Sequence, residues 1–237
     1  MTHIKACGFT TPEPMIAAAQ AGIDSIGLVM IPGLKRSLSI KKAQSILGTF
    51  NEALQGNTRP EIVGLFGDQS PEEVNSIVSK LNMDAVQLCS NEGMAFCSQI
   101  NLPIYKVIGI NPDIPINSQL PRIMVLAQRH SMAGHRIVLD SKPTTKDFGG
   151  TGRTFNWEIA SQLAQAFELQ LAGGLNPENV SEAITTVKPW GVDTSSGLET
   201  AGQKDIQKVI AFIKNAKEAD NSAANKGLRK MLRSIFK

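Results

Sequence analysis

The chain has 237 residues, of which 42% are apolar and 19% are charged. This length and composition permit one large α/β domain with a sizeable core, and they exclude a chain that is disordered over most of its length. No stretch approaches the roughly 18 apolar residues of a membrane span, and polar His3 and Lys5 stand where a signal peptide would be apolar, so the sequence predicts a cytoplasmic protein.

Short β-branched or apolar runs alternate along the chain with longer segments of helical apolar spacing. The fifth helix is only weakly indicated, because the segment before it is rich in helix-breaking residues. The expected strands are residues 3–7, 25–30, 61–67, 85–89, 104–110, 136–140, 168–174 and 191–197. The helices expected after them are residues 11–22, 39–50, 70–81, 91–100, 120–129, 156–167, 176–187 and 205–216.

Strict alternation of strands and helices demands parallel strands joined by helical crossovers. Eight such units over about 215 residues fit a closed (β/α)8 barrel better than an open doubly wound sheet. The predicted fold is therefore a single-domain TIM barrel over residues 1–217, followed by a short basic tail over residues 218–237. In such a barrel, chemistry gathers at the carboxyl ends of the strands.

Three polar side chains stand at or just after the carboxyl ends of expected strands. Cys7 ends the first strand and is therefore expected at the catalytic end of the barrel. Arg36 lies in the loop after the second strand, where it could clamp a carboxylate or simply be solvated. Asp140 ends the sixth strand, where it could be catalytic or could hydrogen-bond the loop. The residue types alone leave these alternatives open.

Glycine-rich segments stand at the carboxyl ends of the last three expected strands: residues 147–155 follow the sixth strand, and residues 172–174 and 193–197 end the seventh and eighth. Glycines and small hydroxyls let backbone N–H groups approach an anion, and the loops after strands seven and eight form the usual phosphate site of these barrels. A single loop would be weak support, because turns need glycine in any case. Three loops at one barrel mouth favour a phosphorylated ligand.

The three cysteines, Cys7, Cys89 and Cys97, are odd in number and have no paired spacing. This pattern predicts free thiols and argues against both a disulfide framework and a zinc site. His130 and His135 flank a loop at the end of the barrel opposite the mouth, so neither is expected to be catalytic. The sequence therefore predicts no metal site.

The chain resembles a known family, phosphoribosylanthranilate isomerase of tryptophan biosynthesis. The resemblance spans residues 4 to about 216 and rests on motifs that occur in the family's order and spacing. The motifs are "KACG", "KRSLS", "VQL", "LDS", "FGGTGRTFNW", "LAGGLNPENV" and "GVDTSSGLE". The resemblance implies a (β/α)8 fold, no cofactor, and an Amadori rearrangement of N-(5-phosphoribosyl)anthranilate into the corresponding 1-deoxyribulose phosphate.

The resemblance also implies roles for individual residues. Cys7 would be the general base and Asp140 the general acid, while Arg36 would hold the anthranilate carboxylate and Asp193 would lie close to the sugar. Because a thiol of pKa about 8.5 is a poor base at neutral pH, we expect the anion-binding mouth to favour the thiolate. Backbone amides near Gly150, Gly152, Gly174, Ser196 and Gly197 would hold the phosphate, and Gly173 and Ser195 are also implied in substrate binding.

The chain departs from the family's pattern after the fourth strand, where Cys89 and Ser90 replace the usual histidine and glycine. The usual aromatic residue of the second strand is also missing. Neither position belongs to the catalytic pair, so activity is expected, with altered affinity as one possibility.

Other phosphate-binding barrels share the glycine loops but need other catalytic groups. Ribulose-phosphate epimerase needs metal-binding histidines, indole-glycerol-phosphate synthase needs a lysine and glutamates, and the histidine-pathway sugar isomerase has an aspartate where this chain has Cys7. A non-catalytic descendant of the barrel would show a broken pair, whereas Cys7 and Asp140 are both present.

The tail carries the positive charge of the chain. Residues 221–237 contain five basic side chains and no acidic one, whereas the rest of the chain has 19 basic and 21 acidic residues. Nothing therefore predicts a nucleic-acid-binding core. Residues 221–227 resemble a flexible linker, and residues 228–237 have the spacing of an amphipathic helix that could dock on the barrel, pair with another chain or contact an anionic surface. The expected partner is a small phosphorylated anion, and the oligomeric state, monomer or homodimer, is left open.

Overall fold

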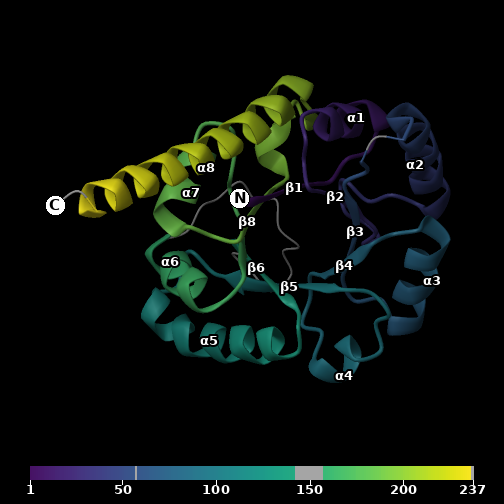
Figure 1. Cartoon of the computed structure of the whole chain (residues 1–237). Coiled ribbons are helices and arrows are strands. Elements are labelled where there is room, and N and C mark those ends of the chain that lie inside the picture. Colours follow the sequence, from purple (N-terminus) through teal and green to yellow (C-terminus); the bar gives the residue numbers. More distant parts are fainter. Residues whose placement is uncertain (57, 142–156, 236–237) are drawn as a thin grey trace.

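The computed structural model describes residues 1–56, 58–141 and 157–235, with side chains described as far as residue 221. Eight parallel strands pair in chain order, and β1 also pairs with β8, so the sheet closes into a barrel. The helices form a ring around this barrel (Figure 1). The prediction of a (β/α)8 barrel is confirmed.

The strands are short, as is usual in such a barrel. The barrel consists of β1 (His3–Cys7), β2 (Ser25–Val29), β3 (Glu61–Phe66), β4 (Ala85–Leu88), β5 (Ile104–Ile110), β6 (Arg136–Ser141), β7 (Leu169–Leu171) and β8 (Gly191–Thr194). A small antiparallel hairpin follows β8 and consists of β9 (Glu199–Thr200) and β10 (Gln203–Lys204).

The helices that cover the barrel are α1 (Pro12–Gln20), α2 (Ile40–Leu54), α3 (Pro71–Leu81), α4 (Met94–Cys97), α5 (Ile116–Met132), α6 (Trp157–Ala166), α7 (Val180–Val187) and α8 (Ile206–Ile235), with a short 3₁₀ turn η1 (Ser196–Leu198). Two of their starts follow the expected capping chemistry. Ser39 and Ser70 each accept a hydrogen bond from a backbone N–H of the first turn, through their side chains.

The strands are buried on both faces, because the inside of the barrel and the helix layer are both apolar. Successive side chains of a strand point to opposite faces, and β3 shows the result. Val63 and Leu65 pack in the cluster inside the barrel, whereas Ile62 and Phe66 pack between the barrel and the helices. This two-sided burial explains why the strands read as continuous apolar runs rather than as alternating ones.

Helices α4, α5 and α8 differ most from the prediction. Helix α4 has only four residues, because the segment before it is held in a turn. In this turn the Ser90 N–H donates to the Glu92 carboxylate, and Lys106 pairs with the same carboxylate. Helix α5 begins at Ile116, before the predicted start, and contains Pro121. A proline in a helix interior usually kinks or breaks the helix, but α5 continues through Pro121, so the helix-breaking residues did not delay its start as predicted.

Helix α8 is continuous across the predicted boundary at 217, so the expected linker at residues 221–227 is helical instead. In Figure 1 its last part, in yellow, projects beyond the ring of helices. Contacts with the barrel reach residue 220, since Ala219 is buried and the Thr2 hydroxyl donates to the Asp220 carboxylate at 2.7 Å. Among the described residues, no helix is long and apolar enough to cross a membrane.

Candidate active site

A cavity of about 270 Å³ opens at the carboxyl ends of the barrel strands. It brings together most of the residues predicted from the sequence: Cys7, Arg36, Asp140, Gly173, Gly174, Asp193, Ser195 and Ser196 all line it. Gly197 lies in η1, directly after these residues. The predicted residues Gly150 and Gly152 fall outside the described part of the chain.

Cys7 stands in a buried group of polar side chains inside the barrel. Its thiol donates to the Asp193 carboxylate, at 3.2 Å from Oδ1, and the Lys5 ammonium hydrogen-bonds its sulfur. Lys5 also donates to Asp193 Oδ2 at 2.7 Å and to Gln87 Oε1 at 2.8 Å. Lys5 and Cys7 are two residues apart on β1 and therefore face the same side of the strand, and Asp193 lies opposite Lys5 in the register of β8.

This environment sets the charge of the resting thiol. Burial raises the pKa of Cys7, the negative charge of Asp193 raises it further, and Lys5 only partly opposes these effects. Burial lowers the pKa of Lys5, but the negative charge of Asp193 and the hydrogen bonds to Asp193 and Cys7 outweigh this effect and hold the lysine in its protonated form. The expectation that the mouth favours the thiolate is therefore wrong for the free protein, because a carboxylate shares the site with the thiol.

Two glycines make room for this arrangement. Gly27 lies beside Cys7 in the register of β1 and β2, and a Cβ on Gly27 would stand 2.4 Å from the Cys7 sulfur. Gly8 has a positive φ of 78°, and a Cβ there would stand 2.4 Å from the Cδ atom of Arg36. The glycine after Cys7 thus lets the Arg36 side chain lie over the end of β1.

Arg36 lines the mouth but is already paired. Its Nε and one terminal nitrogen donate to the two carboxylate oxygens of Glu199, at 2.5 and 3.0 Å. Glu199 also accepts a hydrogen bond from Lys204 at 3.3 Å, and Lys204 donates to the Ser195 carbonyl at 2.7 Å. The pairing fixes the guanidinium in the mouth and leaves its other terminal nitrogen without a hydrogen bond to any described residue.

The loops after β7 and β8 pack tightly against each other at the mouth. Gly173 and Gly174 both have positive φ, of 84° and 69°. A Cβ on Gly197 would stand 1.9 Å from the Leu175 carbonyl oxygen, so only glycine fits there. The Thr194 hydroxyl donates to the same oxygen at 2.6 Å. The two loops thereby present small residues and backbone groups to the cavity, as an anion site requires.

Asp140 lies near the end of β6, across the mouth from β1, and is half-buried. Its carboxylate approaches the β7 loop, since Oδ1 lies 3.2 Å from the position that a Cβ on Gly173 would take. Cys7 and Asp140 therefore face one cavity from different strands. Neither His130 nor His135 lines this cavity.

Sequence reasoning missed four polar residues of the site, namely Lys5, Gln87, Glu199 and Lys204. Lys5 and Gln87 could have been predicted, because each is a long polar residue inside a short apolar strand. Its side chain therefore has to point into the barrel. Glu199 closes the motif "GVDTSSGLE" but was given no role, and Lys204 had no signal, because residues 198–204, which form the hairpin, were predicted as neither strand nor helix. Cys89 is buried next to this group, with its sulfur 3.6 Å from Gln87 Nε2.

The fold and the mouth define a class of protein, a (β/α)8 barrel enzyme whose cavity at the carboxyl ends of the strands brings together a thiol, a carboxyl group and glycine- and serine-containing loops. The model of the family described as N-(5'-phosphoribosyl)anthranilate (PRA) isomerase matches residues 4–215. The chain belongs to this family, and it is an isomerase of tryptophan biosynthesis.

Individual relatives agree over nearly the whole chain. An N-(5'-phosphoribosyl)anthranilate isomerase of Dehalococcoides mccartyi is 38% identical over 223 residues, which cover 94% of this chain and 99% of the relative. The isomerase of Oceanobacillus iheyensis is 38% identical over 217 residues, which cover 92% and 98%. Among solved structures, the phosphoribosyl anthranilate isomerase of Thermotoga maritima has a TM-score of 0.76 at 32% identity, and the match covers 92% of this chain and all of that one.

Proposed function

We propose that this chain converts N-(5'-phosphoribosyl)anthranilate into 1-(2-carboxyphenylamino)-1-deoxyribulose 5-phosphate, with Cys7 as general base and Asp140 as general acid. One observation carries these roles: the thiol and the carboxyl line a single cavity together with the glycine and serine loops after β7 and β8. A related isomerase of known structure binds the reduced form of the same product, at 31% identity and a TM-score of 0.74.

The rearrangement needs an acid first and a base second. The Asp140 carboxyl gives its proton to the ring oxygen of the ribose, the bond between that oxygen and C1 breaks, and a Schiff base forms. Cys7 then removes the proton from C2, which gives an enolamine that tautomerises to the ketone. An acid and a base on different strands of one mouth suit two consecutive proton transfers to different atoms of the sugar.

The base must lose its own proton before it acts. The Cys7 thiol already donates to Asp193, so the thiol proton can pass to that carboxylate, and the adjacent Lys5 ammonium stabilises the thiolate that remains. The transfer leaves the net charge of the buried group unchanged, because one anion replaces another beside the same cation. Lys5 and Asp193 thus act on the substrate through Cys7 and are positioning residues in this proposal.

The two anionic ends of the substrate are held by other groups. Arg36 offers its unpaired terminal nitrogen to the anthranilate carboxylate, with Glu199 holding the guanidinium in place. The backbone around Gly174 and Ser196 holds the phosphate, and charge-assisted hydrogen bonds of this kind are about twice as strong as neutral ones. The residues proposed from the sequence for the phosphate are Gly150, Gly152, Gly174, Ser196 and Gly197, and Gly173 and Ser195 complete the proposed substrate-binding set of these loops.

All of these groups belong to one chain, so the proposed reaction works in a monomer and equally in each subunit of a homodimer. The reaction draws on side chains and backbone alone and uses no cofactor. We place the protein in the cytoplasm, in keeping with its three buried cysteines, none of which forms a disulfide, since reducing compartments disfavour disulfides.

The test is a fluorescence assay that follows the loss of phosphoribosylanthranilate, applied to the purified protein and to Cys7→Ala and Asp140→Asn. Each substitution should lower kcat by at least ~10²–10⁴, the usual worth of a general acid or base. The reduced product analogue should bind both variants nearly as tightly as the parent, because its phosphate and carboxylate contact other loops. Near-normal turnover in Cys7→Ala would reduce the thiol to a packing residue.

A further inference from the structure

Helix α5 ends in a turn that brings two histidines together. The His135 N–H donates to the His130 carbonyl at 3.0 Å, and the Gly134 N–H donates to the Ser131 carbonyl at 2.9 Å. With Gly134 at a φ of 78°, these bonds form a Schellman motif. Such a motif commonly brings an apolar pair of side chains into contact across the turn. In this chain the two positions are held by imidazoles.

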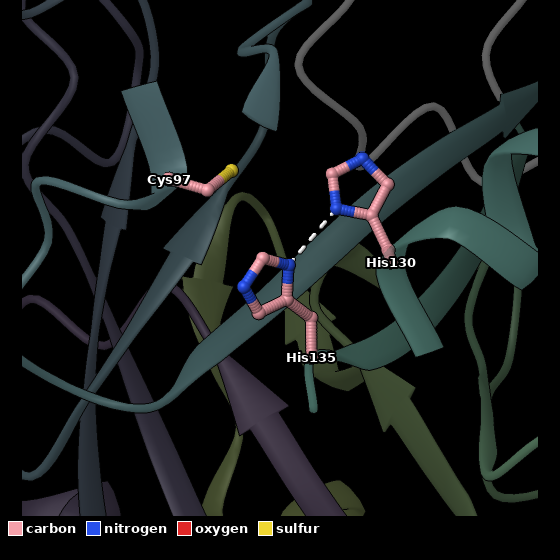
Figure 2. Close-up of side chains that lie close together, drawn as sticks. All are labelled: Cys97, His130 and His135. Carbon is pink, nitrogen blue, oxygen red and sulfur yellow. Dashed lines mark hydrogen bonds between the residues drawn. The ribbon is translucent and has the colours of Figure 1, made fainter. Parts of the chain in front are cut away.

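The two rings face each other, and a thiol faces both. The Nδ1 atoms of His130 and His135 lie 2.9 Å apart, and the sulfur of Cys97 points toward the rings from the end of α4 (Figure 2). One ligand atom from each of the three side chains can be chosen so that all lie within 4.8 Å of one another. Cys97 and His130 are buried and His135 is half-buried.

We propose that Cys97, His130 and His135 bind a divalent transition-metal ion of the zinc class, with a water molecule as fourth ligand. A thiolate and two imidazoles form a donor set that zinc prefers, and zinc with three protein ligands keeps one open position. In a tetrahedral site with Zn–N bonds of about 2.0–2.1 Å, the two nitrogens would lie roughly 3.3 Å apart. The present separation is within a small side-chain rotation of that geometry.

The protonation states of the three side chains suit metal binding. Burial lowers the pKa of His130 to about 4 and also lowers that of His135, so both rings are neutral near pH 7. Burial raises the pKa of Cys97, so the resting group is a thiol. Binding of the ion therefore displaces the hydrogen bond between the rings and releases one proton, from the thiol to solvent. The nearby Lys106 ammonium is paired with Glu92, which limits its repulsion of the ion.

An ion has a route to the site and would join separate elements there. His135 is half exposed on one side, and His130 lines a second cavity, of about 800 Å³, beside α4 and α5. The bound ion would connect the four-residue helix α4 to the α5–β6 turn. Because it would bind the folded chain more tightly than the unfolded one, it would raise the melting temperature, and the increase would grow with the logarithm of the free ion concentration above the Kd.

The experiment uses the full chain, first stripped of metal and then titrated with Zn²⁺ or Co²⁺. We expect one equivalent to bind, one proton to be released per ion, and Co²⁺ to give a thiolate charge-transfer band with the intense visible bands of a tetrahedral site. His135→Ala should weaken binding by on the order of 100-fold or more, since loss of even an outer-shell partner costs 10–100-fold. Cys97→Ala should abolish the charge-transfer band.

The matched control is the double variant Cys7→Ala, Cys89→Ala, which removes the other two thiols and should keep both the stoichiometry and the band. Retention of the band in Cys97→Ala, or its loss in the double variant, would place the ion elsewhere and overturn the proposal. Failure of the parent chain to bind one equivalent would overturn it as well. Because Cys97 is buried, the Cys97→Ala variant can fold poorly, so His135→Ala repeats the test at a half-buried position. Unchanged metal affinity in His135→Ala would also contradict the proposal.

Discussion

The Cys7 thiol and the Asp193 carboxylate are hydrogen-bonded at 3.2 Å inside the barrel, with the Lys5 ammonium bound to both. The base proposed for the reaction is therefore a protonated thiol at rest, held in that state by burial and by the neighbouring negative charge. Removing the charge of Asp193 while keeping its shape should leave Lys5 to act on the sulfur alone.

We accordingly expect Asp193→Asn to lower the pKa of Cys7. The pH dependence of Cys7 alkylation by iodoacetamide, followed on the Cys7 peptide by mass spectrometry, should shift to lower pH. Ser195→Ala is the control, because it alters the same mouth without changing a charge and should leave the profile in place. An unchanged profile in Asp193→Asn would mean that burial alone sets the pKa of the thiol.

Replacing Arg36 with methionine should raise KM about tenfold or more and change kcat little, since a hydrogen bond to a charged group contributes about 1.5–3 kcal/mol and this contact persists through the reaction. Steady-state kinetics with phosphoribosylanthranilate measure both constants. The control is Glu199→Gln, which breaks the same ion pair but keeps the guanidinium in the mouth. Equal increases of KM in the two variants would assign the effect to the ion pair rather than to contact with the substrate.

Lys204 should make stability depend on pH in the alkaline range. Burial lowers the pKa of its ammonium to about 8, against the opposing attraction of Glu199. Between that value and the ordinary lysine pKa, the unfolded chain binds more protons than the folded one, so the free energy of unfolding contributed by this group rises with pH, by up to ~1.4 kcal/mol per pH unit.

Lys204→Met removes this contribution. Denaturant unfolding of both proteins between pH 7 and about 10.5 should give a difference in the free energy of unfolding that grows with pH in favour of the parent. A constant offset between the two curves would contradict the lowered pKa of Lys204, whatever the size of the offset.

Deleting residues 221–237 should leave kcat within a few-fold of the parent value, since the last described contacts with the barrel are made by Ala219 and Asp220. Solubility, self-association or binding to anionic surfaces should change, because the deletion removes five basic residues. A longer deletion that begins at residue 219 is the control and should lower the melting temperature. Loss of folding in the shorter deletion would make the tail part of the barrel.

Sequence reasoning went furthest where the physical signal is local. The alternation of apolar runs and helical periods predicted all eight units, and the predicted helices that begin at Ser39 and Ser70 are capped by these serines in the structure. It failed where an outcome depends on contacts between distant residues. The turn that shortens α4 depends on Lys106 from the next strand. The charge state of Cys7 depends on Asp193, 186 residues away.

The same limit applies to the side chains around Arg36 and to the histidine cluster. Nothing near Arg36 in the chain announces that Glu199 will pair with it from a hairpin beyond β8. Cysteine spacing predicted no metal site because it compares cysteines with one another, whereas Cys97 meets two histidines from another helix and its turn. The assignment of acid, base and carboxylate partner came from family resemblance, since the residue types by themselves also suited loops and caps.

The closure of the barrel has a consequence for the newly made protein. Lys5 and Cys7 leave the ribosome well before Asp193, which belongs to β8 and can pair with β1 only after the strands between them have been made. The seam between the first and last strands therefore creates the environment of the thiol, and loop closure over so many residues is a late and slow event. A nascent or truncated chain that lacks β8 has Cys7 without the carboxylate that helps to set its pKa. Turnover therefore indicates that the last strand of the barrel is in place.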